Sequence, residues 1–98
     1  SEVVASQRSL NALQPWTVVS IHRHPNSNDS IVLLCGKAEE IFYDGEGRET
    51  ERLMMDPEAG SYGCVVPAGS WHTIVALEPT VIMEVKDGRY GEDGSECR

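Results

Sequence analysis

The three histidines of this chain stand at two places in the sequence. His22 and His24 form a His-x-His pair, and His72 lies much further along. Residues two apart on a β-strand point to the same face and lie about 6.6 Å apart, so His22 and His24 direct their imidazoles the same way. Neutral imidazole is the commonest metal ligand among protein side chains. The spacing therefore predicts that these two rings serve one metal ion.

A carboxylate and the third imidazole complete the predicted set. Asp29 lies just before the next predicted strand, and by alternation its side chain shares a face with Ile31 and Leu33. A carboxylate buried there would be costly unless a metal ion or a histidine compensated it, although a turn or capping role suits Asp29 as well. His72 enters a strand directly after the Pro-x-Gly turn at 67–69.

From residue 16 onward, runs of β-branched residues alternate with turn residues, which is typical of an all-β sandwich or barrel. We expect strands at 17–24, 30–35, 38–43, 51–55, 62–66, 71–77 and 80–86. Residues 1–13 are expected to be strand or irregular, and 87–98, rich in Gly, Asp and Glu, to form a loosely ordered tail. No helix of useful length is predicted.

The run at 31–35 is apolar at every position, so both faces of its strand need cover. A second sheet would cover one face and a second copy of the chain the other, which predicts a homodimer. Cys35 and Cys64 are expected to be small core residues, and the Glu39–Glu40 pair to lie on a solvated strand face.

Composition excludes several classes of partner. The chain has 98 residues and a net charge of -8, which predicts a single domain over 1–98 and argues against nucleic acid and anionic membranes. No apolar stretch approaches the roughly 20 residues of a membrane helix. The odd set of three cysteines favours a reduced, cytoplasmic setting.

Two spacings resemble the signatures of the cupin superfamily: His-x-His, four residues, a carboxylate, six residues and Gly, followed later by Pro-x-Gly-x-x-His. They fall on His22, His24, Asp29 and Gly36, and then on Pro67, Gly69 and His72. The resemblance implies a small double-stranded β-helix, the cupin or jelly-roll barrel. It also implies one divalent metal ion held by His22, His24, Asp29 and His72.

A closer resemblance is to the WbuC-type cupin fold metalloproteins. It rests on Gln7-Arg8-x-Leu10-Asn11-Ala12-Leu13, the His22-Arg23-His24-Pro25 run, Phe42-Tyr43-Asp44-x-x-Gly47, Trp71-His72-Thr73 and Glu84-Val85-Lys86-x-Gly88-x-Tyr90. Members of that family occur among bacterial surface-polysaccharide genes and have no settled activity. They usually carry sequence before this segment, so we expect the native chain to begin earlier than Ser1.

The chain departs from the family pattern at three positions. Asp29 stands where the pattern has Glu, and its side chain is one methylene shorter, so this ligand is either lost or bound through a water. Ala76 replaces an Asn, and Ser61 replaces a Gly. The last two positions are not metal ligands.

The mouth of a small barrel is where a substrate would meet the metal, so polar and aromatic residues there are candidate pocket residues. They are Arg8, Tyr62, Trp71, Glu84 and Tyr90. An opposing interpretation is open for the strand at 80–86: alternation makes Val81, Met83 and Val85 its apolar face and puts Glu84 and Lys86 outside.

Three imidazoles and a carboxylate hold Zn, Fe, Mn, Ni or Co as the divalent ion, and the sequence does not choose among them. An enzyme would use the ion to polarise a small-molecule ligand, a sugar or a small hydroxy or carboxylate compound of surface-polysaccharide metabolism. No general base stands at a recognisable spacing, so the catalytic residues are not identified. The alternatives are a binding module without catalysis and a module in which the ion only braces the barrel.

Overall fold

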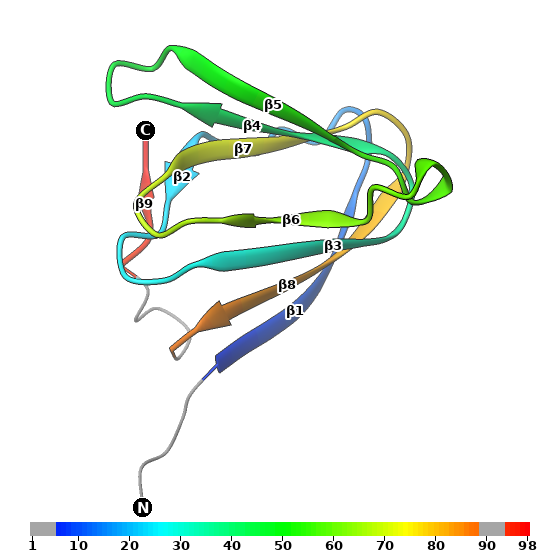
Figure 1. The fold of residues 1–98 in the computed structure, drawn as a ribbon, viewed down its shortest axis with the longest axis horizontal. Coiled ribbons are helices and arrows are strands. Elements are labelled where there is room, and N and C mark those ends of the chain that lie inside the picture. The colour runs from blue at the N-terminus through cyan, green and yellow to red at the C-terminus, as the bar shows by residue number, and fades with distance from the viewer. Residues whose placement is uncertain (1–5, 89–93) are drawn as a thin grey trace, which may run out of the picture.

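The strands of this computed structural model form two antiparallel sheets that face each other, and the structure describes residues 6–88 and 94–98 (Figure 1). The four-stranded sheet has the order β1 (Ser6–Leu13), β8 (Thr80–Asp87), β3 (Asp29–Cys35) and β6 (Gly63–Val66). The five-stranded sheet has the order β5 (Glu49–Met55), β4 (Ala38–Tyr43), β7 (Trp71–Ala76), β2 (His22–Arg23) and β9 (Glu96–Cys97). The prediction of an all-β jelly roll is confirmed.

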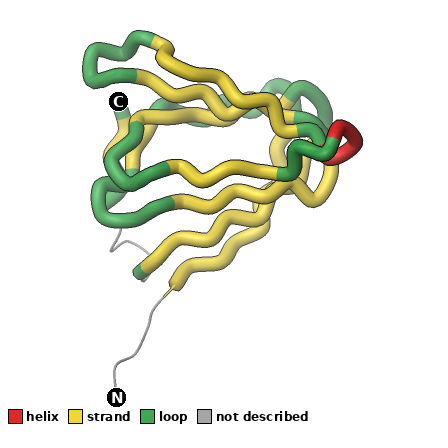
Figure 2. The backbone as a smooth tube through the Cα atoms, viewed as in Figure 1, coloured by secondary structure: helices red, strands yellow, loops and turns green. Residues whose placement is uncertain are grey.

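Helical structure in the described residues is limited to one 3-10 turn, Pro57–Ala59 (Figure 2). The side chain of Asp56 caps it by accepting from the backbone N–H of Glu58, and Gly60 ends it in the left-handed conformation, with a φ of 82°. No helix in the described part of the chain is both long and apolar enough to cross a membrane.

The prediction of a strand over 17–24 is wrong for most of its length, because only His22 and Arg23 join a ladder. The chain leaves β1 through a turn in which Thr17 N–H donates to the Gln14 carbonyl at 2.9 Å. It then crosses from the four-stranded to the five-stranded sheet, where the Thr73 hydroxyl donates to the Val19 carbonyl at 2.6 Å. A segment that changes sheets cannot pair continuously with either one.

The prediction of a loose tail is wrong for residues 94–98. β9 pairs with β2, and the Arg98 N–H donates to the Ile21 carbonyl at 2.8 Å. The Arg23 guanidinium donates twice to one Glu96 carboxylate oxygen, at 2.7 and 2.9 Å. These contacts dock the end of the chain beside the His-x-His pair, whereas Tyr90 lies outside the described residues.

The core lies between the two sheets and is aliphatic over most of its length. Its buried members are Leu13, Ile31, Leu33, Ala38, Met55, Val66, Ile74, Ala76 and Ile82. Cys64 packs partly buried against this core, but Cys35 is exposed, so the prediction that Cys35 is a core residue is wrong. The register between β3 and β8 shifts between Leu33 and Cys35, and this bulge breaks the alternation on which the prediction rested.

The outer face of the four-stranded sheet is apolar and open. Leu10 is 65% exposed, Leu34 55% and Val65 58%. Their strands, β1, β3 and β6, are members of the same sheet. The second sheet covers only the inner side of these strands.

Candidate metal site

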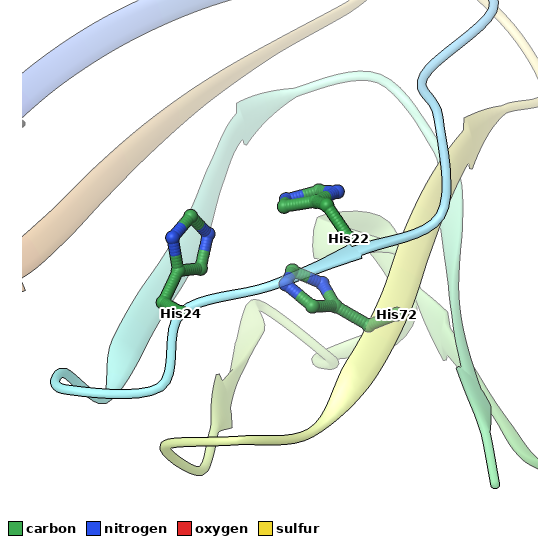
Figure 3. Close-up of side chains that lie close together, drawn as sticks. All are labelled: His22, His24 and His72. Atoms are coloured by element: carbon green, nitrogen blue, oxygen red, sulfur yellow. The ribbon is translucent and has the colours of Figure 1, made fainter. Parts of the chain in front are cut away.

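The fold brings the three histidines together on neighbouring strands. His22 on β2 lies directly opposite His72 on β7, so both side chains point to the same face of the sheet. His24 follows two residues later, in the turn that leads to β3. One ring nitrogen from each histidine lies within 4.8 Å of the other two, and Figure 3 shows the three imidazoles gathered around a common space.

Each of the three rings is oriented by a contact at its Nδ1 atom. His22 Nδ1–H donates to the Ser20 carbonyl at 2.8 Å, which leaves a lone pair on Nε2. His24 Nδ1 lies 2.7 Å from the Ser95 hydroxyl, and His72 Nδ1 lies 2.5 Å from Glu40 Oε1. Such contacts hold metal-binding imidazoles in place and select the tautomer that leaves the other nitrogen free for a metal.

Glu40 is the site residue that the sequence interpretation missed. We expected it on a solvated strand face, but its side chain is fully buried, so that prediction is wrong. β4 runs between β5 and β7, and the ladder pairs Phe42 with His72, which places Glu40 diagonally across from His72 on the inner face. The available signal was the alternation of Ala38, Glu40 and Phe42, which assigns Glu40 to the face of two apolar residues.

Asp29 is also fully buried, at the start of β3. Its Oδ2 atom lies 3.9 Å from His24 Nε2, and its hydrogen-bonding neighbour is a second carboxyl group, that of Glu84. Burial raises the pKa of Asp29 to about 8, with the neighbouring Glu84 carboxyl group as the next cause. Asp29 is therefore directed at the edge of the histidine cluster without being one of its three members.

Burial also keeps the imidazoles neutral. It lowers the pKa of His72 to about 4, and the pKa of His22 is lowered as well, mainly by burial. A neutral imidazole is the form that binds a metal ion. His72 Nε2 is buried and accepts no hydrogen bond, so it is available as a ligand atom.

The donor set fits a divalent ion of borderline character. In a tetrahedral site with metal–nitrogen distances near 2.1 Å, ligand nitrogens lie about 3.4 Å apart. The three ring nitrogens already lie within 4.8 Å, so small side-chain rotations would bring them to that spacing. Asp29, whose Oδ2 atom lies 3.9 Å from His24 Nε2, offers a carboxylate beside them.

A cavity of about 270 Å³ adjoins the histidine cluster. Its polar lining residues are His22, His72, Glu40, Glu84 and Asn11. Glu84 points inward because its neighbours in β8, Thr80 and Ile82, are buried on the same face. The alternation that put Glu84 and Lys86 outside is wrong, since the register also sets Lys86 opposite the buried Asp29.

The structure does not bring the remaining predicted pocket residues to this cavity. Arg8 is exposed and pairs with Val85 on the outer face of the four-stranded sheet, and Tyr62 is 61% exposed. Trp71 lines a separate, open groove of about 680 Å³, where the Arg23 guanidinium lies 4.5 Å from its ring centre. The predicted Tyr90 lies outside the described residues.

Solved structures of known proteins share this architecture. A dTDP sugar isomerase from Desulfovibrio desulfuricans G20 aligns with a TM-score of 0.77 and 18% identity over 94% of this chain and 63% of its own. The capsular polysaccharide assembling protein CapF from Staphylococcus aureus gives 0.74 and 20% over 86% of this chain and 23% of its own. An oxalate decarboxylase from Lactobacillus farciminis gives 0.69 and 19% over 85% and 24%. The chain spans less than two thirds of each of these proteins.

These likenesses, with the two facing sheets, define the class of the protein as a cupin-like jelly roll. The chain belongs to the family described as "Domain of unknown function (DUF6016)", whose model matches residues 1–55. That match includes His22, His24, Asp29 and Glu40 but ends before His72. No protein with a curated description matches the sequence.

Proposed function

We propose that this protein is a metal-binding cupin of the WbuC type. It holds one divalent ion, Zn, Fe, Mn, Ni or Co, through Nε2 of His22, His24 and His72, with the Asp29 carboxylate as the fourth ligand. It acts in the cytoplasm on a sugar or a small hydroxy or carboxylate compound of surface-polysaccharide metabolism.

One observation carries the metal assignment. Three imidazoles from distant parts of the sequence converge within 4.8 Å, and each has its Nδ1 atom engaged by another group. A set of core histidines stabilised by hydrogen bonds alone would not leave His72 Nε2 buried without a partner, beside an Asp29 carboxyl group that faces a second carboxyl group, Glu84. A shared cation would compensate all of these atoms together.

The chain's own residues have separate roles in this proposal. Glu40 accepts from His72 Nδ1–H and so directs Nε2 of that ring to the ion, while the Ser20 carbonyl does the same for His22. Glu84 and Asn11 are polar lining residues that face a ligand in the adjoining cavity. The bound ion would supply Lewis acidity, which polarises a carbonyl or stabilises an oxyanion on the ligand.

The cavity supports a ligand-binding role rather than a brace. An ion that only braced the barrel would be enclosed by apolar side chains, whereas here a cavity with two acidic lining residues adjoins the histidines. The dTDP sugar isomerase and the capsular polysaccharide protein among the structural neighbours support a sugar-related ligand. Whether the ligand is turned over separates an enzyme from a binding module.

Metal content tests the site. Wild-type protein incubated with each of the five ions and then desalted should retain about one ion per chain by mass spectrometry. His22→Ala, His24→Ala and His72→Ala should each lose it while keeping the β-sheet circular dichroism of the wild type. Glu78→Ala, on the exposed turn before β8, is the matched control and should keep the ion. A wild type that retains none of the five ions would overturn the proposal.

The length of the fourth ligand can be tested separately. Asp29→Asn should weaken metal binding if the carboxylate is a ligand, and Asp29→Glu should restore or exceed it because the longer side chain reaches further. Equal affinity in all three proteins would remove Asp29 from the ligand set and leave the three histidines.

Turnover is tested with sugar nucleotides and free sugars in the presence of Fe(II), Mn(II) or Zn(II), against His22→Ala. Product formation that depends on both the ion and His22 identifies an enzyme. Equal rates in the two proteins would exclude a mechanism that uses the metal.

The proposal includes a homodimer in which a second copy covers the outer face of the four-stranded sheet. That face presents Leu10, Leu34 and Val65 to solvent, and its apolar character suits an isologous contact. Light scattering should give twice the chain mass, and Leu34→Glu should give the monomer. A wild type that is monomeric at all concentrations would contradict this part.

A further inference from the structure

The cavity beside the histidines is lined by both acidic polar and aliphatic side chains. Two of its polar members are the acidic residues Glu40 and Glu84. The apolar lining residues are Ala12, Leu13, Val19, Ile31, Ile74 and Ile82. All the lining residues belong to the described part of the chain, and none of them is Lys or Arg.

This lining is unfavourable for an anion. A carboxylate ligand is normally received by a guanidinium, an ammonium or a group of backbone N–H donors in addition to any metal. Here the lining presents the two acidic side chains of Glu40 and Glu84 and no guanidinium or ammonium group. Lys86 pairs with Asp29 across β8 and β3 but is not among the residues that line the cavity, so the bound ion would supply the positive charge inside the cavity itself.

The size of the cavity limits the ligand further. Pockets for drug-sized molecules measure about 300 to 1,000 Å³. At about 270 Å³, this cavity is smaller than that range and takes a compound of a few carbon atoms or one small sugar ring. A whole nucleoside diphosphate sugar does not fit inside it.

Glu84 is placed to select the ligand. It extends from β8 in the four-stranded sheet, whereas His22 and His72 extend from the other sheet, and all three line the cavity. Asn11 on the neighbouring β1 donates to Glu84 Oε2 at 3.4 Å, which orients the carboxyl group. A ligand hydroxyl in the cavity would therefore find a hydrogen-bond acceptor in Glu84.

We propose that the cavity takes a small uncharged compound with two adjacent oxygen atoms, an α-hydroxyketone or a deoxy sugar of that pattern. The two oxygens face the histidine cluster, the hydroxyl donates to Glu84, and a short aliphatic end packs against Ile31, Ile74 and Ile82. This inference rests on the proposed metal function and narrows its ligand class, with Glu84 as the residue that determines specificity.

A matched pair of probes tests the preference for an uncharged ligand. 3-Hydroxybutan-2-one and lactate differ in that a methyl ketone replaces a carboxylate, and calorimetry on zinc-loaded protein compares them directly. The hydroxyketone should bind at least tenfold more tightly than lactate, although a free metal ion prefers the carboxylate. 1-Hydroxypropan-2-one, which has one methyl group fewer, should bind about fourfold more weakly than 3-hydroxybutan-2-one.

Two variants assign the selection to Glu84. Glu84→Gln should weaken 3-hydroxybutan-2-one about five- to tenfold and should strengthen lactate, because it removes the acidic group and alters one hydrogen bond. Glu78→Gln makes the same substitution on the exposed turn before β8 and should change neither affinity.

Metal content measured in the same samples separates the two levels of the proposal. If wild type and Glu84→Gln hold about one zinc ion per chain but bind lactate more tightly than the hydroxyketone, the ligand class is wrong and the metal function stands. The same holds if Glu84→Gln and Glu78→Gln behave alike. If the wild type retains none of the five ions, the metal function fails and the ligand class fails with it; if it retains another ion in place of zinc, that ion is used for the comparison.

Discussion

The two halves of the space between the sheets differ in polarity, and buried polar atoms without hydrogen-bond partners lie in one half. One half is filled by aliphatic side chains such as Leu33, Met55 and Ala76, all under 5% exposed. The other half holds His72, which is 2% exposed and whose Nε2 atom lacks a partner, and Asp29, which is fully buried beside the Glu84 carboxyl group. Both halves are built on the same two sheets, so the difference lies in the side chains.

This contrast separates stability from function. Aliphatic burial stabilises the fold in proportion to the area removed from water, whereas an unpartnered buried polar group opposes folding. The polar half therefore lowers the stability of the metal-free protein, and a bound cation would offset this loss. Substitutions in the aliphatic half should lower stability and leave metal binding intact. Substitutions in the polar half should weaken metal binding and leave the stability of the metal-free protein intact.

The largest effect on stability is expected in the aliphatic half. Leu33→Ala should lower the free energy of unfolding by about 3 to 5 kcal/mol, because Leu33 is 3% exposed and its truncation leaves a cavity. Denaturant titration measures the loss. Leu77→Ala, at a position 44% exposed, should cost less than half as much. The folded Leu33→Ala protein should still bind one metal ion, and a loss of metal without a loss of stability would break the division between the halves.

The next largest effect concerns the carboxylate behind His72. Glu40→Gln keeps an acceptor for Nδ1–H but removes the charge, and it should lower metal affinity about 10- to 100-fold. Competition with a chromogenic chelator measures this change. Stability of the metal-free protein should not fall, because burial raises the pKa of Glu40 to about 8 and Gln replaces a group that is costly to ionise.

Glu39→Gln is the matched control for this experiment. Glu39 is the preceding residue of β4, and its carboxylate lies 3.5 Å from an Arg52 guanidinium nitrogen instead of facing the histidines. Its substitution should leave metal affinity unchanged. Equal losses in the two variants would mean that Glu40 acts only through general charge and not through the orientation of His72.

A smaller effect is the pH dependence of the metal-free protein. The folded-state pKa values of Asp29 and Glu40 are about 8, well above their unfolded values, so folded chains hold protons that unfolded chains release. Between about pH 4 and 6.5 the lowered pKa values of His22 and His72 act in the opposite direction and offset this trend.

Between about pH 6.5 and 8 the raised pKa values of Asp29 and Glu40 act without this offset, so the free energy of unfolding should fall with rising pH by at least about 1 kcal/mol. Urea titrations at fixed pH values measure the slope, and Asp29→Asn should reduce it. Saturation with metal should reverse the sign, because ligand groups must be deprotonated to bind the ion. A flat profile without metal would contradict the raised pKa values.

The parts of the site that the sequence predicted are those set by strand parity. His22, His24 and His72 follow from alternation and from the turn before β7, and the structure brings them together. Parity failed where the chain is irregular. It misplaced Cys35 beyond the bulge in β3, and it extended the strand before His22 through a segment that changes sheets.

The rest of the site depends on which strands become neighbours. Glu40 was interpreted as solvated because two adjacent glutamates resemble a surface strand, and only the pairing of β4 with β7 shows that it lies behind His72. Glu84 faces inward because β8 lies between β1 and β3, and its own apolar pattern fits either face. Such long-range pairing is not encoded in the local alternation of either strand.

The smallest expected effect involves the end of the chain. The Ser95 hydroxyl lies 2.7 Å from His24 Nδ1, on the segment that β9 docks against β2. Ser95→Ala should lower metal affinity about two- to threefold, because one solvent-accessible hydrogen bond contributes roughly 0.5 kcal/mol. The stability of the metal-free protein should not change. Ser70→Ala, which removes a hydroxyl from the turn before β7, should have no effect. If both variants bind the ion as tightly as the wild type, Ser95 does not contribute to the metal site. β9 then contributes only packing beside β2.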